Sequence, residues 1–143
     1  MNNSQYEFVE AEKGYVNYYQ EGETPEKRAV INYGELNVEG NQMVIMDHGM
    51  GGAFTFNEAF SLMISCKDQA EIDYFWDKLS VVPESEQCGW VKDQFGLSWQ
   101  IVPANMDKIM AGATEEGRKR GMAALLNMKK LDIAALEKAV AEE

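Results

Sequence analysis

An apolar stripe at helical spacing, set between strand-like segments, constrains the fold of this chain most strongly. Its members recur every three or four residues, as on one face of a helix: Ile72, Phe75, Trp76 and Leu79. Asp68 is placed to cap that helix at its start. We predict a strand over 56–65 before the helix and strands over 88–92 and 97–102 after it, with room for another near 80–87. This succession predicts an α+β fold.

The N-terminal part has the pattern of antiparallel strands. Residues 15–19 are aromatic and β-branched enough for a short strand. Two further strands, over 29–38 and 42–47, are predicted to form a hairpin across the polar, glycine-containing link 39–41. The glycine-rich stretch 48–52 is predicted to be a loop, because ordering three glycines costs too much chain entropy.

The chain after residue 103 is predicted to be helical. Thr114, followed by two glutamates, has the pattern of a helix start. Asp132 is placed to cap a last helix, with Leu131 positioned to contact Leu136 across its first turn. We therefore expect a helical C-terminal extension over 104–143.

Composition limits the class of protein. At 143 residues the chain is expected to form one domain, 1–143. Thirteen basic and 24 acidic residues give a net charge of −11, which argues against nucleic acid or an anionic membrane as partner. We find no apolar run long enough to span a membrane and no export signal. Two cysteines are too few for a disulfide framework, so we expect a cytoplasmic protein.

Several separate motifs, in order, resemble one family. They lie within 56–76, 87–93, 96–103 and 128–136, and the similarity extends over about 30–140. Together they resemble the PhnB-like branch of the glyoxalase/bleomycin-resistance (vicinal oxygen chelate) superfamily, often labelled as a 3-demethylubiquinone-9 3-methyltransferase domain. The resemblance implies two βαβββ modules whose strands surround a concave pocket, usually in a dimer.

The N-terminus departs from the family pattern. Residues 1–28 are atypical and leave little room for the first strand and helix of the first module, so we expect that module to be truncated. A missing first strand exposes a sheet edge, an aggregation hazard unless something covers it. Either residues 5–10 fill the gap or a second copy of the chain does, and exchange of an element is one way in which it could. A shortened gene product is the alternative. We expect a homodimer, for which exchanged or shared sheet elements are one arrangement.

The resemblance also bears on metal binding. In metal-using relatives a histidine and a glutamate of each module face the pocket, and in the second module these positions fall on Ser61 and Gln100. A hydroxyl and a neutral amide are poor ligands for a divalent cation. We therefore expect no catalytic metal and no cofactor.

Side-chain alternation predicts the lining of the pocket. If Ser61 and Gln100 face inward, so do their neighbours at even spacing, while Trp99 and Ile101 face the helix. The predicted ligand-binding residues are Asn57, Ser61, Met63, Ser98 and Gln100. A half-polar concave surface suits a small molecule with hydrogen-bonding groups. It would equally suit a barrel interior filled with water.

Candidate catalytic groups are few. His48, Asp47 and Glu58 could each act as a base, although a loop histidine without a partner carboxylate is more often merely solvated. Cys88 lacks a basic neighbour that would activate its thiol. Trp90 and Trp99 could stack on a ligand, although aromatic side chains at these positions are more often core.

Three classes of function follow. The first is a metal-free protein that binds a small molecule as a homodimer. The second is a degenerate or metal-independent lyase or isomerase of the glyoxalase type. The third is a non-catalytic dimeric structural or regulatory protein. The absence of a paired acid–base pattern favours the first over the second, and whether the chain is an enzyme stays open at this point.

Overall fold

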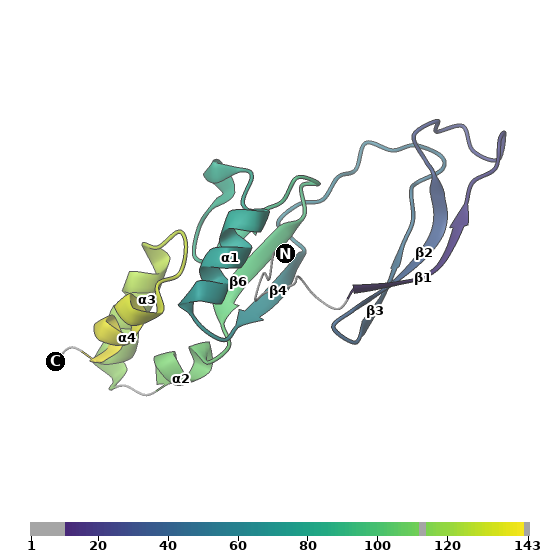
Figure 1. The fold of residues 1–143 in the computed structure, drawn as a ribbon. Coiled ribbons are helices and arrows are strands. Elements are labelled where there is room, and N and C mark those ends of the chain that lie inside the picture. Colours follow the sequence, from purple (N-terminus) through teal and green to yellow (C-terminus); the bar gives the residue numbers. More distant parts are fainter. Residues whose placement is uncertain (1–10, 112–113, 142–143) are drawn as a thin grey trace. The chain divides into compact units, whose positions relative to one another are not determined.

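The chain forms two compact units, Met1–Phe54 and Thr55–Glu143. The computed structural model describes residues 11–111 and 114–141, and each unit has its own sheet (Figure 1). Strands and helices together confirm the α+β prediction. That one glyoxalase-type domain spans both units stays a prediction.

Unit 1 is a three-stranded antiparallel sheet in the order β1-β2-β3, formed by Ala11–Tyr18, Ile31–Val38 and Asn41–Ile45. The predicted hairpin is present. Its turn residues Glu39 and Gly40 have φ of 50° and 77°, values that match the twist of the paired strands. Residues 11–54 contain no helix, and a shortened first module stays a prediction. The predicted filling strand over 5–10 lies outside the described residues.

Unit 2 begins with a strand, a helix and two more strands. These are β4 (Ser61–Cys66), α1 (Gln69–Leu79), β5 (Trp90–Lys92) and β6 (Ser98–Pro103), with the sheet order β4-β6-β5. β4 runs parallel to β6, and β5 runs antiparallel to it. The parallel pair needs a crossover, which α1 supplies.

The predicted apolar stripe forms the core of unit 2. Figure 1 shows α1 lying against the sheet, and buried side chains of both elements pack together: Cys66, Ile72, Phe75, Trp76, Val91 and Ile101. The Asp68 carboxylate accepts a hydrogen bond from the Glu71 amide at 2.9 Å, which confirms the predicted cap. Burial raises the pKa of the Cys66 thiol to about 12.

Two predicted strand segments differ in the structure. β4 begins at Ser61 rather than at residue 56, because the Asn57 side-chain oxygen accepts a hydrogen bond from the Ala59 amide at 2.9 Å. Such a local bond favours a turn over a strand. The segment 80–87 contains a short 3-10 helix, Pro83–Ser85, in place of the further strand.

The C-terminal extension is helical, as predicted. It comprises α2 (Met106–Ala111), α3 (Glu115–Leu126) and α4 (Ile133–Ala141). Thr114 caps α3 by accepting from the Gly117 amide, and Asp132 accepts from the Ala135 amide at the start of α4. Their apolar sides pack on one another around Ile109, Leu136 and Val140. No helix among the described residues is both long and apolar enough to cross a membrane.

The segment between α3 and α4 is anchored to the rest of unit 2. The amides of Cys88 and Gly89 donate to the carbonyls of Met128 and Lys129, both at 2.8 Å. The Gln69 side chain donates to the Leu131 carbonyl at 3.0 Å and accepts from the Ile133 amide at 2.9 Å. This helical extension is therefore bonded to both α1 and the segment just before β5.

Candidate functional site

Side-chain alternation divides the unit 2 sheet into two faces. α1 covers the face that carries Val91, Trp99 and Ile101. Because neighbouring residues of a strand point to opposite sides, the alternate residues share the other face. We call this the open face, and it carries Ser61, Met63, Trp90, Lys92, Ser98 and Gln100.

The strand register arranges the open face in two rows. One row crosses the sheet as Ser61, Ser98 and Lys92, and the other as Met63, Gln100 and Trp90. The Gln100 amide nitrogen donates a hydrogen bond to the Ser61 hydroxyl at 2.9 Å, which joins the two rows diagonally. The open face therefore presents hydroxyl, amide, ammonium, thioether and indole groups side by side.

Four of the five predicted pocket residues lie on this face. Ser61 and Gln100 are partly exposed, and Met63 is 59% exposed. Ser98, between its row neighbours, is only 2% exposed. Asn57 instead lies in the turn before β4, where its side chain bonds the backbone, so alternation along the strand does not reach it. That these residues bind a ligand stays a prediction.

Sequence analysis missed Lys92, and it favoured a core position for Trp90 over stacking on a ligand. Trp90 is absent from the buried cluster, and its neighbour Val91 occupies that place. The signal was available: β5 alternates, and an apolar Val91 facing α1 sends the residues on either side to the opposite face.

Lys92 is paired with Glu58. The Lys92 ammonium donates to the Glu58 carboxylate, and the side chains are 22% and 62% exposed respectively. This hydrogen bond is the largest cause of a lowered pKa for Glu58. A carboxylate held ionised by an ammonium is a weak base, so the arrangement favours pairing over proton abstraction.

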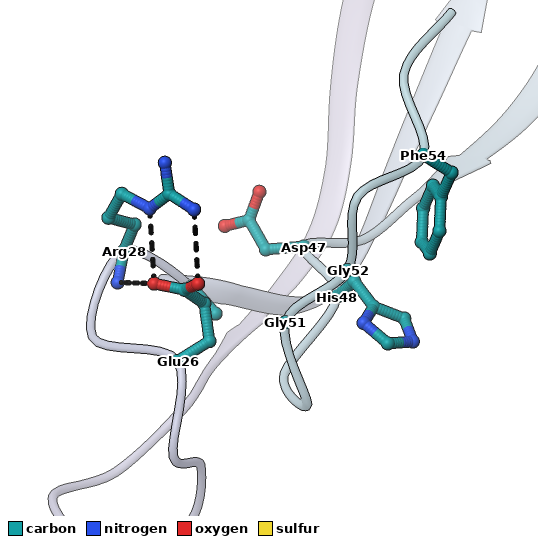
Figure 2. A pocket seen from close by; sticks show the side chains of 8 residues that line it. Glu26, Arg28, Asp47, His48, Gly51, Gly52 and Phe54 are labelled. Atoms are coloured by element: carbon teal, nitrogen blue, oxygen red, sulfur yellow. Dashed lines mark hydrogen bonds and ion pairs between the residues drawn. The ribbon is translucent and has the colours of Figure 1, made fainter.

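A second candidate site is a hollow of about 250 Å³ in unit 1, close to the other two predicted bases (Figure 2). Its lining includes Asp47, His48 and Phe54. The His48 imidazole stands edge-on to the Phe54 ring, with centroids 5.0 Å apart and planes at 81°. His48 is exposed, and it donates no hydrogen bond to a described carboxylate that would fix its tautomer.

Asp47 has a structural task in this hollow. One of its carboxylate oxygens accepts from the amides of Val30 and Ile31, each at 2.8 Å. These two bonds lower the pKa of Asp47. Figure 2 shows the Asp47 carboxylate and the His48 imidazole pointing to different sides of the backbone. The two groups therefore do not form an acid–base pair.

The cation beside the hollow is also engaged. Arg28 donates to both carboxylate oxygens of Glu26 at 3.1 Å (Figure 2). The Arg28 backbone amide donates to the same carboxylate at 2.9 Å, and these bonds lower the pKa of Glu26 to about 2. The pair is neutral overall, so the hollow has no uncompensated charge from it.

The donor chemistry of the open face does not fit a metal ion. Over 11–111 and 114–141, no three His, Cys, Asp or Glu side chains gather as a metal-binding group. Ser61 and Gln100, at the positions that the resemblance pairs with metal ligands, are neutral and hydrogen-bonded to each other. Neither supplies the charge or basicity that divalent cations prefer.

Comparison with known proteins points to one family. The family model described as 3-demethylubiquinone-9 3-methyltransferase matches residues 6–102, a range that includes the whole open face. A solved structure of a PhnB protein from Bacillus cereus is similar, with a TM-score of 0.54 and 27% sequence identity. The match covers 66% of this chain and 81% of that one. No curated protein matches.

Proposed function

The chain belongs to the 3-demethylubiquinone-9 3-methyltransferase family of PhnB-like proteins, and from this we propose that it binds a small molecule on the open face, without a metal ion, as a homodimer. The observation that carries the proposal is the diagonal hydrogen bond between Gln100 and Ser61 amid apolar Met63 and Trp90. Ligand sites combine such apolar surface with a few placed polar groups.

The geometry supports binding over catalysis. Of the three candidate bases, Asp47 is held by two backbone amides and Glu58 by Lys92. His48 lacks a carboxylate partner in the described part of unit 1. General acid–base catalysis requires a group that is free to take or give a proton at the reacting atom. The lyase or isomerase alternative therefore has less support than binding.

The family description names a methyltransferase, but we do not propose methyl transfer for this chain. A nucleotide-type cofactor is commonly cradled by a glycine-rich turn between a strand and a helix. The strand-to-helix links in the described residues, 67–68 and 104–105, contain no glycine. We propose a binding role for that reason.

The homodimer is proposed from unit 1. Among the described residues its sheet ends in the edge strands β1 and β3, and the unit carries apolar side chains that are largely exposed: Tyr15, Val44 and, just after β3, Met46. Exposed edges and apolar surface of this kind are usually covered in a functional assembly. A second copy of the chain meets that need. We also propose a reducing cytoplasm as its location, because Cys66 and Cys88 are both free.

A native mass spectrum of the purified protein, without chelator treatment, tests the proposal. We expect a dimer that carries an additional small mass and no metal. The double variant Ser61→Ala/Gln100→Leu should lose that mass, whereas Gln94→Leu, an exposed turn position, should retain it. A stoichiometric metal, or a mass that persists in the double variant, would refute the proposed site. A dimer without any bound mass would favour the structural or regulatory alternative.

A further inference from the structure

We propose that Lys92 forms a subsite for the carboxylate group of a small ligand, and that Glu58 occupies this subsite until the ligand displaces it. The inference rests on the proposed function, because it names the chemical class that the open face would accept. It assigns to Glu58 the role of an internal competitor rather than of a catalytic base.

Lys92 is well placed for such a role. It lies in the row with Ser61 and Ser98, and the second row, with Trp90, runs beside it. It is the one basic residue in the three strands of unit 2. Only 22% of its side chain is exposed, and a shielded ammonium requires an anion close by. Lys92 is thus the one strand residue on the open face whose charge can bind an anionic group.

Glu58 reaches Lys92 from outside the sheet. It belongs to the turn before β4, and its side chain is 62% exposed. The turn is closed by two bonds that do not involve the Glu58 carboxylate, from the amides of Ala59 and Phe60 to Asn57. The carboxylate can therefore leave Lys92 without breaking a bond of the sheet, and it returns to water at little cost.

The surroundings define the ligand class further. A flat apolar body would lie beside Trp90 and Met63, within reach of the polar groups of Ser61 and Gln100. A single ammonium in a chain of net charge −11 suits one negative charge, because the overall field opposes a polyanion. These features favour a small aromatic or apolar monocarboxylate.

Benzoate and its neutral counterpart benzamide provide the probes. Each is titrated at low salt into the full-length protein, followed by amide resonances of the open face in ¹H–¹⁵N spectra. Replacement of Glu58 by Gln removes the competitor, and benzoate binding should tighten about two- to fivefold, the range of an exposed ion pair. Benzamide binding should not change.

Glu115→Gln is the matched control. It removes one negative charge from another exposed ion pair, with Lys119, far along the chain in α3, so it reports the effect of net charge alone. It should leave benzoate affinity within a factor of about 1.5 of the parent, because screened surface charges act weakly. Lys92→Met should abolish the preference for benzoate over benzamide.

The outcomes separate this inference from the proposed function. Equal effects of Glu58→Gln and Glu115→Gln, or a benzoate preference that survives in Lys92→Met, would overturn the carboxylate subsite. Failure of benzoate to shift open-face resonances in both the parent and Glu58→Gln would overturn it as well. None of these results would remove a small mass seen in the native spectrum of the parent, which is the criterion for binding on the open face.

Discussion

Two glycines in unit 2 allow a measurement of how tightly Ile101 and Leu131 pack against the backbone before β5. Gly89 and Gly96 have nearly the same φ, +83° and +81°. A side chain in this left-handed region costs roughly 1–2 kcal/mol at either position. Their surroundings differ: nothing lies within 4 Å of a Cβ built at Gly96, whereas one at Gly89 would meet the Ile101 carbonyl oxygen at 2.9 Å and Leu131 at 3.1 Å.

Replacing each glycine by alanine separates the two effects. Both variants place a side chain on a left-handed backbone, and for Gly96→Ala this is the only cost. It should therefore lower the free energy of unfolding by about 1–2 kcal/mol. Gly89→Ala adds an overlap that its backbone cannot relieve, since its amide donates to Lys129 and its carbonyl accepts from Ile101, both at 2.8 Å. Overpacking in a well-filled region costs about 1–3 kcal/mol more, so we expect a total of roughly 2–5 kcal/mol.

Guanidinium denaturation followed by circular dichroism gives the free energy, and an unchanged m-value shows that both variants unfold as the parent does. Indole fluorescence follows the same transition, because Trp90 is next to Gly89. Equal losses for the two variants would refute the reasoning, since they would show that Leu131 and Ile101 do not close on Gly89. A larger loss for Gly96→Ala would refute it more strongly.

Three further predictions follow from the same contacts. Gln69→Ala removes the two bonds that link α1 to the backbone of Leu131 and Ile133 at the start of α4, and should lower the free energy of unfolding by about 1–3 kcal/mol in a denaturant titration, whereas Gln94→Ala should change it little. Asp47 has a pKa lowered from 3.8, so its contribution to stability is complete above that value and is lost as the pH falls through the folded pKa; the protection of its two amide partners from hydrogen exchange, measured relative to the intrinsic rate at each pH, should fall at acid pH, and Asp47→Asn should remove that dependence. Because Ser61 and Gln100 touch, Ser61→His/Gln100→Glu should bind zinc more tightly than the parent by calorimetry, and no gain would show that the two side chains do not share a face.

The elements that the sequence predicted are those whose signals are local or periodic. The stripe from Ile72 to Leu79 specifies a helix and its buried side within eleven residues of chain, and Asp68 marks its start. The hairpin around Gly40 is equally local, because positive φ values at the turn favour that residue type. The family resemblance placed Ser61 and Gln100 on the inner face, and alternation then added Met63 and Ser98 to it without knowledge of the register.

The start of β4 could not be read in the same way. Phe56 and Phe60 continue the apolar pattern of the strand, yet the Asn57 side chain bonds the Ala59 amide and the strand begins only at Ser61. Whether a short polar side chain bonds its own backbone or leaves it to a ladder depends on a partner strand being present. At residues 56–60 no partner strand is paired, so the local bond prevails.

The same turn explains why the charge of the open face was missed. Glu58 and Lys92 are 34 residues apart, and neither has an ion-pairing partner at helical spacing that would reveal the contact. The pair exists because β6 lies between β4 and β5 in the sheet, which brings the turn before β4 and the end of β5 to the same end of the sheet. Alternation along one strand predicts which face of the sheet Lys92 lies on. Its ion-pair partner depends on the order of all three strands, which the sequence pattern of one strand does not contain. A carboxylate interpreted as a candidate base is, in the folded unit, the counter-ion of a lysine, and its chemistry is determined by that neighbour.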